Sequence, residues 1–173
     1  MTAAERAAAS AAICDAANAL LAERLSPRDA VALYAPKGSE VETRRIDRFA
    51  RAGGLVVVYP RVHGQVRVLA FHAVTPDMLA PSRFGLREPA ADATEVAVAD
   101  IAAFFVPGLA FDRTGGRVGW GRGHYDATFA AASPRALRVG LAYECQVVDQ
   151  VAREAHDQAL HIIITEVATH VVA

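Results

Sequence analysis

The segment "GRVGWGRGHYD", residues Gly116–Asp126, combines glycines with charged and aromatic side chains in a pattern suited to phosphate chemistry. Its glycines at positions 119, 121 and 123 allow positive φ angles and bring backbone N–H groups close to a ligand. A glycine-rich loop before a helix binds phosphate well, because the helix N-terminus adds the positive end of a dipole. Arg117 and Arg122 can neutralise phosphate charge, and Asp126 can bind Mg²⁺, which prefers carboxylate and phosphate oxygens.

Two common phosphate-binding motifs do not describe this segment. The sequence contains no G-x-x-x-x-G-K-[ST], and His124 stands where the last glycine of G-x-G-x-x-G would be. A glycine-rich hairpin turn without a ligand is therefore the alternative interpretation. The arginine, tyrosine and aspartate side chains around the glycines favour the phosphate-binding one.

Composition limits the classes of protein to which the chain can belong. With 173 residues, of which 53% are hydrophobic, it can form one well-packed domain. The 18 Lys and Arg residues nearly balance the 19 Asp and Glu residues, which argues against binding nucleic acid or an anionic membrane through bulk charge. No apolar run approaches the roughly 20 residues that span a bilayer.

The ends of the chain and its cysteines indicate a cytoplasmic protein. The alanine-rich N-terminus is interrupted by polar residues, unlike the continuous apolar core of a signal peptide, so we expect a helix there. Cys14 and Cys145 lie far apart in the sequence and show no metal-ligand spacing. We expect two reduced, buried thiols.

Alternating strand and helix patterns must position the glycine segment. We expect helices over residues 3–24 and 41–53 and from 126 to 132, and strands over 30–35, 55–60, 66–74, 101–106, 137–143 and 161–165. Pro60 should end the second of these strands, and residues 75–93 should form a loop region. This order predicts an α/β fold, a three-layer sandwich with a mostly parallel central sheet, in a single domain over residues 1–173. Ligands bind beyond the carboxyl ends of strands in such sheets, where the polar clusters of this sequence also lie.

The chain resembles a known family in the residues that surround the glycine segment. "VPGLAFD" (Val106–Asp112), followed closely by "GRVGWGRGHYD", looks like the signature of the 5-formyltetrahydrofolate cyclo-ligases, also called methenyltetrahydrofolate synthetases. Weaker matches occur in the right order from Val31 to Glu166. They are "SEVET" (Ser39–Thr43), "YPR" (Tyr59–Arg61), "GLREP" (Gly85–Pro89), "ECQ" (Glu144–Gln146), "HD" (His156–Asp157) and "IITE" (Ile163–Glu166).

The resemblance implies an enzyme of folate one-carbon metabolism with a three-layer α/β fold. Members of the family use ATP and Mg²⁺ to convert 5-formyltetrahydrofolate to 5,10-methenyltetrahydrofolate, with release of ADP and phosphate. The implied partners are a reduced folate and ATP as co-substrate, with no nucleic acid and no membrane, in a monomer or homodimer. No protein nucleophile is required, in keeping with a chain that lacks G-x-S-x-G and an arranged Cys–His pair.

The resemblance also assigns roles to matching positions. The implied ATP-binding residues are Arg117, Val118, Gly119, Trp120, Gly121, Arg122, Gly123, His124 and Tyr125. The implied folate-binding residues are Ala35, Glu40, Trp120 and Tyr125, and the implied catalytic residues are Glu40, Arg122 and Tyr125. Asp126 and Asp157 are the implied Mg²⁺ ligands. From the residues alone, Glu40 has an alternative role as a cap of the following helix, and Trp120 either stacks on folate or covers the loop.

The N-terminus departs from the family pattern. Family members usually begin with a basic helix whose Lys and Arg side chains reach the ATP phosphates, whereas Arg6 is the one basic residue among the first twenty here. We expect either that another arginine takes over this contact or that phosphate binding is weakened. Two further hypotheses follow: a family member that binds folate or nucleotide without turnover, and a sugar-phosphate isomerase or acyl-transferase activity on a related scaffold.

Overall fold

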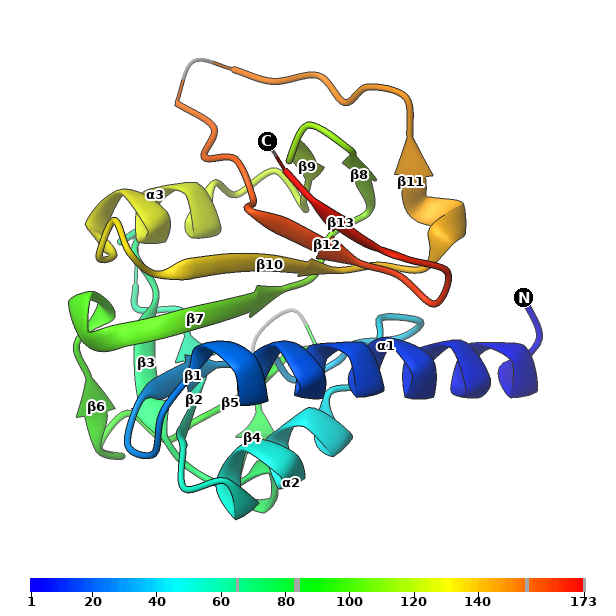
Figure 1. The fold of residues 1–173 in the computed structure, drawn as a ribbon. Helices are drawn as coiled ribbons and strands as arrows, with labels where there is room; N and C mark the ends of the chain where they lie inside the picture. Colours follow the sequence, from blue (N-terminus) through cyan, green and yellow to red (C-terminus); the bar gives the residue numbers. More distant parts are fainter. Residues whose placement is uncertain (65, 83–84, 155, 173) are drawn as a thin grey trace.

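A mixed sheet forms the centre of the molecule (Figure 1). The computed structural model describes residues 1–64, 66–82, 85–154 and 156–172, and within them this sheet has eight strands. In spatial order these are β13 (Thr169–Val171), β12 (Ile162–Ile164), β10 (Leu137–Leu141), β7 (Ile101–Val106), β1 (Ala30–Ala32), β2 (Val56–Arg61), β3 (Ala70–Ala73) and β6 (Glu95–Val96). The strands from β12 to β2 pair in parallel, and antiparallel strands complete both edges.

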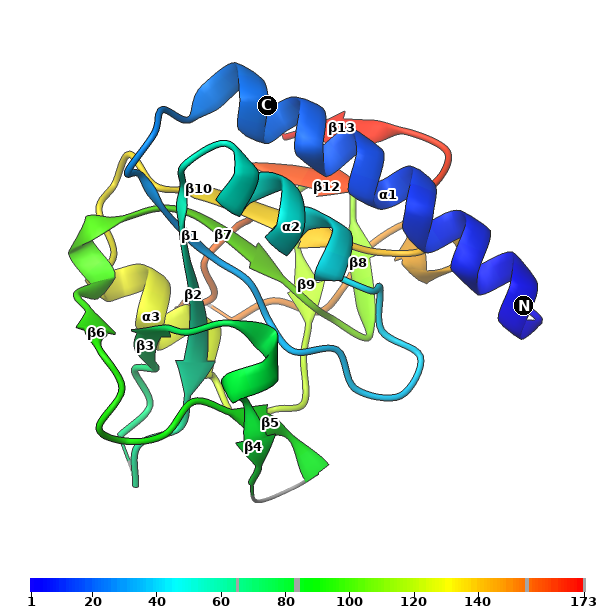
Figure 2. The same ribbon diagram turned by 90° about the horizontal axis from the view of Figure 1, so that it is seen from below.

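Helices cover both faces of this sheet. α1 (Ala3–Arg24) and α2 (Arg44–Ala52) lie together on one face, and α3 (His124–Ala131) lies on the other (Figures 1 and 2). α1 starts with a capping box between Thr2 and Glu5. None of the helices in the described residues combines the length and the apolar character that a membrane crossing requires. The predicted α/β class, with three layers and a mostly parallel sheet, is confirmed.

Alternating side chains of β7 fill the two layers between sheet and helices. Ala103 and Phe105 belong to the hydrophobic cluster under α1 and α2, while Phe104 and Val106 belong to the cluster under α3. The Phe104 ring meets the ring of Phe129 in α3 edge-on, with 5.6 Å between centroids. This alternation follows from the two-residue period of a strand, which sends successive side chains to opposite faces.

A second, three-stranded sheet lies on the α3 side of the main one (Figure 1). It consists of β11 (Val147–Val148), β8 (Ala110–Asp112) and β9 (Arg117–Val118) in that order, and Phe111 of β8 shares the cluster under α3. We did not predict these strands, because two or three residues are too few to show a period. The first residues of the glycine segment therefore form a strand rather than a loop.

The region from residue 75 to 93 is mostly irregular, as predicted. It contains a 3₁₀ turn, η1 (Pro76–Met78), and a short pair of antiparallel strands, β4 (Ala80–Pro81) and β5 (Arg87–Glu88). Residues 83 and 84 of this region lie outside the described residues. Residues 65, 155 and 173, which belong to the single domain predicted over residues 1–173, also lie outside them.

Four local predictions are wrong. β2 continues through Pro60 to Arg61, because its pairing with β1 ends at Val58 and a proline is tolerated where one side of a strand has no neighbour. α2 starts at Arg44, three residues later than expected. α3 starts two residues earlier than expected, at His124. Cys14 is buried, but Cys145 is exposed, since it lies in a short 3₁₀ turn after β10.

Candidate active site

A cavity of about 660 Å³ lies at the carboxyl ends of β1, β2 and β7. Residues that directly follow these strands form its floor: Tyr34 and Ala35 after β1, Val62 after β2, and Pro107 after β7. This is the edge at which a parallel α/β sheet usually binds its ligand. The sequence placed its polar clusters after the same strands.

The glycine segment forms one wall of the cavity. Every residue from Arg117 to Asp126 lines it. Gly121 and Gly123 have φ angles of +74° and +64°, a backbone conformation that side chains other than glycine rarely adopt, whereas Gly119 lies outside that region. Because α3 begins directly after Gly123, the N-terminal turn of that helix opens into the cavity.

Asp112, at the end of β8, anchors the start of this wall. It is fully buried, and its Oδ1 accepts hydrogen bonds from the backbone N–H of Thr114 (2.9 Å) and Gly116 (3.0 Å) and from the Thr114 hydroxyl (2.6 Å). Its Oδ2 accepts one from the N–H of Val151, at 2.9 Å. Burial acts to raise the pKa of Asp112, but the hydrogen bonds from Thr114, Val151 and Gly116 outweigh it and hold the pKa below its usual value.

We did not assign Asp112 a role from the sequence. The signal was present, since an aspartate followed two residues later by threonine and then by two glycines is typical of a turn in which the carboxylate bonds the following N–H groups. A Cβ on Gly116 would lie 2.4 Å from both Asp112 and Val151, so only glycine fits there.

Arg117 and Asp126 form an ion pair beside the cavity. Nη2 of Arg117 donates to both oxygens of Asp126, at 3.1 and 3.2 Å, and the two side chains are 7% and 16% exposed. The Arg117 guanidinium also lies over the Tyr125 ring, 5.3 Å from its centroid. Burial raises the pKa of the Tyr125 hydroxyl well above its usual range, so this phenol stays protonated.

Glu40 lines the same cavity, next to Trp120 of the glycine segment. Its Oε2 accepts a hydrogen bond from the backbone N–H of Lys37 at 2.9 Å. Burial raises the pKa of the Glu40 carboxyl, although hydrogen bonds from the Lys37 backbone and the Trp120 side chain reduce the shift. The N-cap of α2 is Thr43 and makes no side-chain capping bond, so the helix-capping alternative for Glu40 is wrong.

Trp120 and Lys37 meet at the edge of the cavity. The Trp120 side chain is 70% exposed, and Nζ of Lys37 lies 5.9 Å from the centroid of its ring. Lys37 is the single lysine of the chain. An exposed aromatic ring beside a cation is available to stack on a flat ligand.

The two predicted magnesium ligands line the same cavity. The Asp157 side chain is 27% exposed, and its Oδ2 accepts a hydrogen bond from the N–H of Glu154 at 2.7 Å. The next residue, Gln158, donates its N–H to Oδ1 of Asp126 at 3.2 Å, which holds this segment against α3. No group of three His, Cys, Asp or Glu side chains in the described part of the chain could hold a metal ion by itself. Two carboxylates are nevertheless a suitable donor set for Mg²⁺, which commonly takes one or two together with waters and substrate phosphates.

The "GLREP" match supplies residues that we had not assigned to the site. Leu86, Arg87 and Glu88 line the cavity. Glu88 is almost fully buried and accepts a hydrogen bond from the N–H of Val62 at 3.1 Å, which fixes this segment to the end of β2. This segment is therefore part of the cavity wall and not a plain surface turn.

The cations among the described residues of the cavity come from loops and short strands and not from α1. No residue of α1 is among the described residues that line it, and Nη1 of Arg6 donates instead to the carbonyl of Met1. Lys37, Arg87, Arg117 and Arg122 line the cavity in its place.

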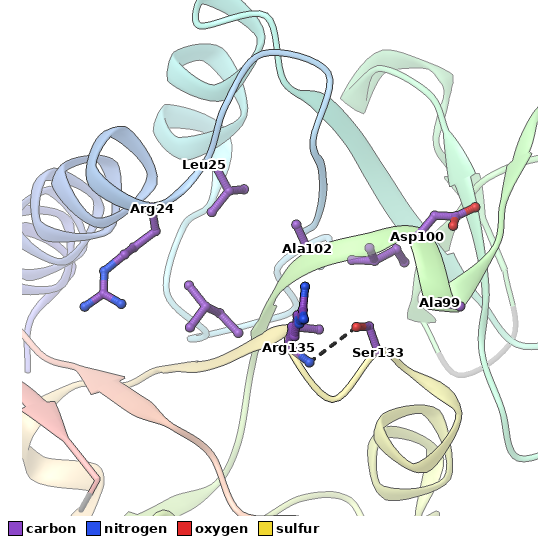
Figure 3. A pocket seen from close by; sticks show the side chains of 10 residues that line it. Arg24, Leu25, Ala99, Asp100, Ala102, Ser133 and Arg135 are labelled. Carbon is purple, nitrogen blue, oxygen red and sulfur yellow. Dashed lines mark hydrogen bonds between the residues drawn. The ribbon is translucent and has the colours of Figure 1, made fainter.

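A smaller depression of about 280 Å³ lies at the opposite end of the sheet (Figure 3). It is lined by the end of α1 at Arg24 and by residues around the starts of β7 and β10, including Asp100 and Arg135. The backbone N–H of Arg135 donates to the hydroxyl of Ser133 at 3.3 Å. None of the predicted site residues lies there.

Comparison with known proteins identifies the family of the chain. A model of the 5-formyltetrahydrofolate cyclo-ligase family matches residues 1–166. A relative of that name from Mycolicibacterium smegmatis is 30% identical over 78% of this chain and 72% of its own, and one from Saccharomyces cerevisiae is 31% identical over 88% and 82%. The solved structure of a 5,10-methenyltetrahydrofolate synthetase from Aquifex aeolicus superposes with a TM-score of 0.83 and 28% identity, over 99% of this chain and 85% of that one. The chain therefore belongs to the 5-formyltetrahydrofolate cyclo-ligase family.

Proposed function

We propose that the protein converts 5-formyltetrahydrofolate to 5,10-methenyltetrahydrofolate with ATP and Mg²⁺, releasing ADP and phosphate. The observation that carries this proposal is that one cavity contains the glycine segment, the carboxylates of Asp126 and Asp157, and the half-buried Glu40. Family membership supports it, because the relatives described above carry the names of this activity.

ATP would place its phosphates along the glycine segment. Positive φ at Gly121 and Gly123 turns the backbone so that N–H groups can approach phosphate oxygens, and the N-terminal turn of α3 adds a favourable dipole. Arg122 and Lys37 line the same space and can neutralise phosphate charge.

Mg²⁺ would be held by Asp126 and Asp157, and when bound it neutralises charge on the phosphates of ATP. Asp126 belongs to the first turn of α3, and Asp157 is held by a hydrogen bond from the Glu154 backbone. Both carboxylates therefore have fixed supports on this chain.

The reduced folate would occupy the part of the cavity between Glu40, Ala35, Trp120 and Tyr125. The formyl oxygen attacks the γ-phosphorus of ATP, and the bond from that phosphorus to ADP breaks. N10 of the folate then attacks the activated formyl carbon, N10 loses its proton, and phosphate leaves with the former formyl oxygen. The chain supplies position and charge neutralisation, as in other phosphoryl transfers.

Glu40 would orient the folate beside the transferred phosphoryl group. Its raised pKa moves the pH range in which the carboxyl titrates closer to neutrality than that of an exposed glutamate. Trp120 would cover the folate ring from the outer side, given its exposed position at the edge of the cavity.

The test is the appearance of the near-ultraviolet absorbance of the methenyl product. Purified protein with ATP, Mg²⁺ and 5-formyltetrahydrofolate should develop this absorbance, and omission of ATP should prevent it. Glu40→Gln should lower turnover at least tenfold. Glu42→Gln, two residues away on the exposed side of the chain, is the matched control and should turn over like the wild type. No product at saturating substrates would refute the proposed function.

The other two hypotheses give different results in the same experiment. A family member that binds without turnover would show ATP or folate binding by calorimetry but no ADP. A sugar-phosphate isomerase or acyl transferase would need no ATP, and none of the relatives described above has such a name. A cytoplasmic location and a monomeric or homodimeric state stay predictions from the sequence.

A further inference from the structure

Arg117 is enclosed to a degree that does not suit a side chain reaching for a nucleotide. Only 7% of it is exposed, and its guanidinium lies between Asp126 and two aromatic rings, 5.3 Å from the centroid of Tyr125 and 5.9 Å from that of Phe129. Its Nε is buried and has no hydrogen-bond partner among the described residues. Within the described part of the chain, Nη2 of Arg117 donates to both oxygens of the Asp126 carboxylate.

Asp126 is held in one orientation by these contacts. Oδ1 accepts from Arg117 at 3.1 Å and from the N–H of Gln158 at 3.2 Å, and Oδ2 accepts from Arg117 at 3.2 Å. The donors come from β9 and from the segment beside Asp157, so the carboxylate is fixed from two sides. A carboxylate with fixed orientation loses less entropy when it binds a cation.

We propose that Arg117 is a positioning residue, which holds Asp126 in place for the metal ion and does not itself contact the phosphates of ATP. This inference rests on the proposed function, since it assigns roles within that site. In this arrangement Arg122 and Lys37 bind the phosphates in place of Arg117, since both line the cavity from more exposed positions.

The alternative is that Arg117 swings toward the nucleotide when ATP binds. Such a movement would separate a buried ion pair and withdraw the guanidinium from the rings of Tyr125 and Phe129. Separating a buried pair is costly because each partner is left as an uncompensated charge. Arg122 belongs to the same glycine segment and is exposed, so it can meet phosphate without leaving a buried position.

The two roles predict different responses to metal. If Arg117 acts through Asp126, replacing Arg117 raises the Mg²⁺ concentration needed for half-saturation. The affinity for ATP in the absence of metal then stays unchanged. If Arg117 contacts phosphate, its removal weakens metal-free ATP binding directly. Trp120 is the one tryptophan of the chain and belongs to the glycine segment, so its fluorescence, together with calorimetry, reports nucleotide binding.

The experiment compares Arg117→Gln with Arg122→Gln in two titrations. The first adds ATP in the presence of EDTA, and the second adds Mg²⁺ at a fixed ATP concentration. For Arg117→Gln we expect a metal-free Kd for ATP within about threefold of the wild type and at least a tenfold higher Mg²⁺ concentration at half-saturation. For Arg122→Gln we expect the reverse, with metal-free ATP binding at least tenfold weaker.

A second set of variants keeps the proposal testable should Arg117→Gln fail to fold. Arg117→Lys retains the charge but cannot reproduce the planar guanidinium contact. In the Mg²⁺ titration, Arg117→Lys combined with Asp126→Asn should be no weaker than Asp126→Asn alone, since Arg117 acts only through that carboxylate. Additive losses would overturn the proposal.

The outcomes also separate this proposal from the proposed function. If Arg117→Gln weakens metal-free ATP binding tenfold and leaves the Mg²⁺ titration unchanged, the positioning role is wrong while the cyclo-ligase function stands. If the wild-type protein binds no ATP in either titration, both are wrong. If the wild type binds ATP and Arg117→Gln alters only the Mg²⁺ titration, the positioning role holds, whether or not the folate product forms.

Discussion

Replacing Asp112 by Asn removes one hydrogen bond and little volume, so it measures how firmly the wall of the cavity is anchored. Oδ1 accepts from the backbone and hydroxyl of Thr114 and from the N–H of Gly116, and an amide oxygen can keep these bonds. Oδ2 accepts from the N–H of Val151, and the amide NH₂ of Asn would face that donor. The substitution therefore replaces one hydrogen bond by a contact between two donors, the amide NH₂ of the new asparagine and the N–H of Val151, at a fully buried site.

The expected loss of stability follows from these contacts. Losing a hydrogen bond to a charged group costs about 1.5–3 kcal/mol, and a buried donor left without a partner costs about 1–3 kcal/mol. We expect Asp112→Asn to lower the free energy of unfolding by about 3–4 kcal/mol, allowing for relaxation near Val151. For a chain of this size that corresponds to a fall in Tm of roughly 6–16 °C.

The assay is urea denaturation followed between about pH 3 and pH 7. The pKa of Asp112 is lowered in the folded state, so its contribution is present above the unfolded value of about 3.9 and is lost as pH falls through the lower folded value. The difference between Asp112→Asn and wild type should therefore shrink below about pH 4. Asp149→Asn, an exposed neighbour, is the control and should change stability by less than about 0.5 kcal/mol. A difference for Asp112→Asn below about 1 kcal/mol, or one that does not change with pH, would refute the reasoning.

Three further predictions concern the walls of the cavity. Gly116→Ala should lower the midpoint of urea denaturation, because its Cβ would clash with the buried side chains of Asp112 and Val151. Gly119→Ala is the control and should leave the midpoint unchanged, because nothing lies within 4 Å of its Cβ. Equal midpoints for the two variants would contradict this prediction. ATP should slow the acylation of Lys37 by an amine-reactive label, read by peptide mass spectrometry, and unchanged labelling at saturating ATP would exclude Lys37 from phosphate binding. Burial raises the folded pKa of Glu40, so its ionised form costs stability at neutral pH, and this cost vanishes as pH falls below the unfolded value. Glu40→Gln should therefore be at least as stable as wild type at about pH 7, with a gain that disappears toward about pH 4, and a large loss at neutral pH would count against the raised pKa.

The sequence predicted best those elements whose pattern is local and long. α1 has helix-forming residues without Gly or Pro over its whole length, and β7 is a continuous apolar run between Asp100 and Pro107, so the bounds of both are confirmed. β8 and β9 are too short to show a period, and the pairing of β2 beyond Val58 depends on which strands lie beside it. Tertiary pairing therefore decided these elements.

The site divides in the same way. Glycine at 121 and 123, arginine at 122 and a helix start after them are properties of one continuous segment, so the sequence by itself predicted a glycine turn that leads into a helix. The pairing of Asp112 with Val151 joins residues 39 apart, and the meeting of Glu40 with Trp120 depends on β1 and β7 lying side by side. Whether Arg117 faces solvent or Asp126 was likewise open until α3 and β9 were placed together. Short-range backbone preferences can be read from neighbouring residues, whereas burial and charge pairing depend on chain segments that meet only in the folded protein.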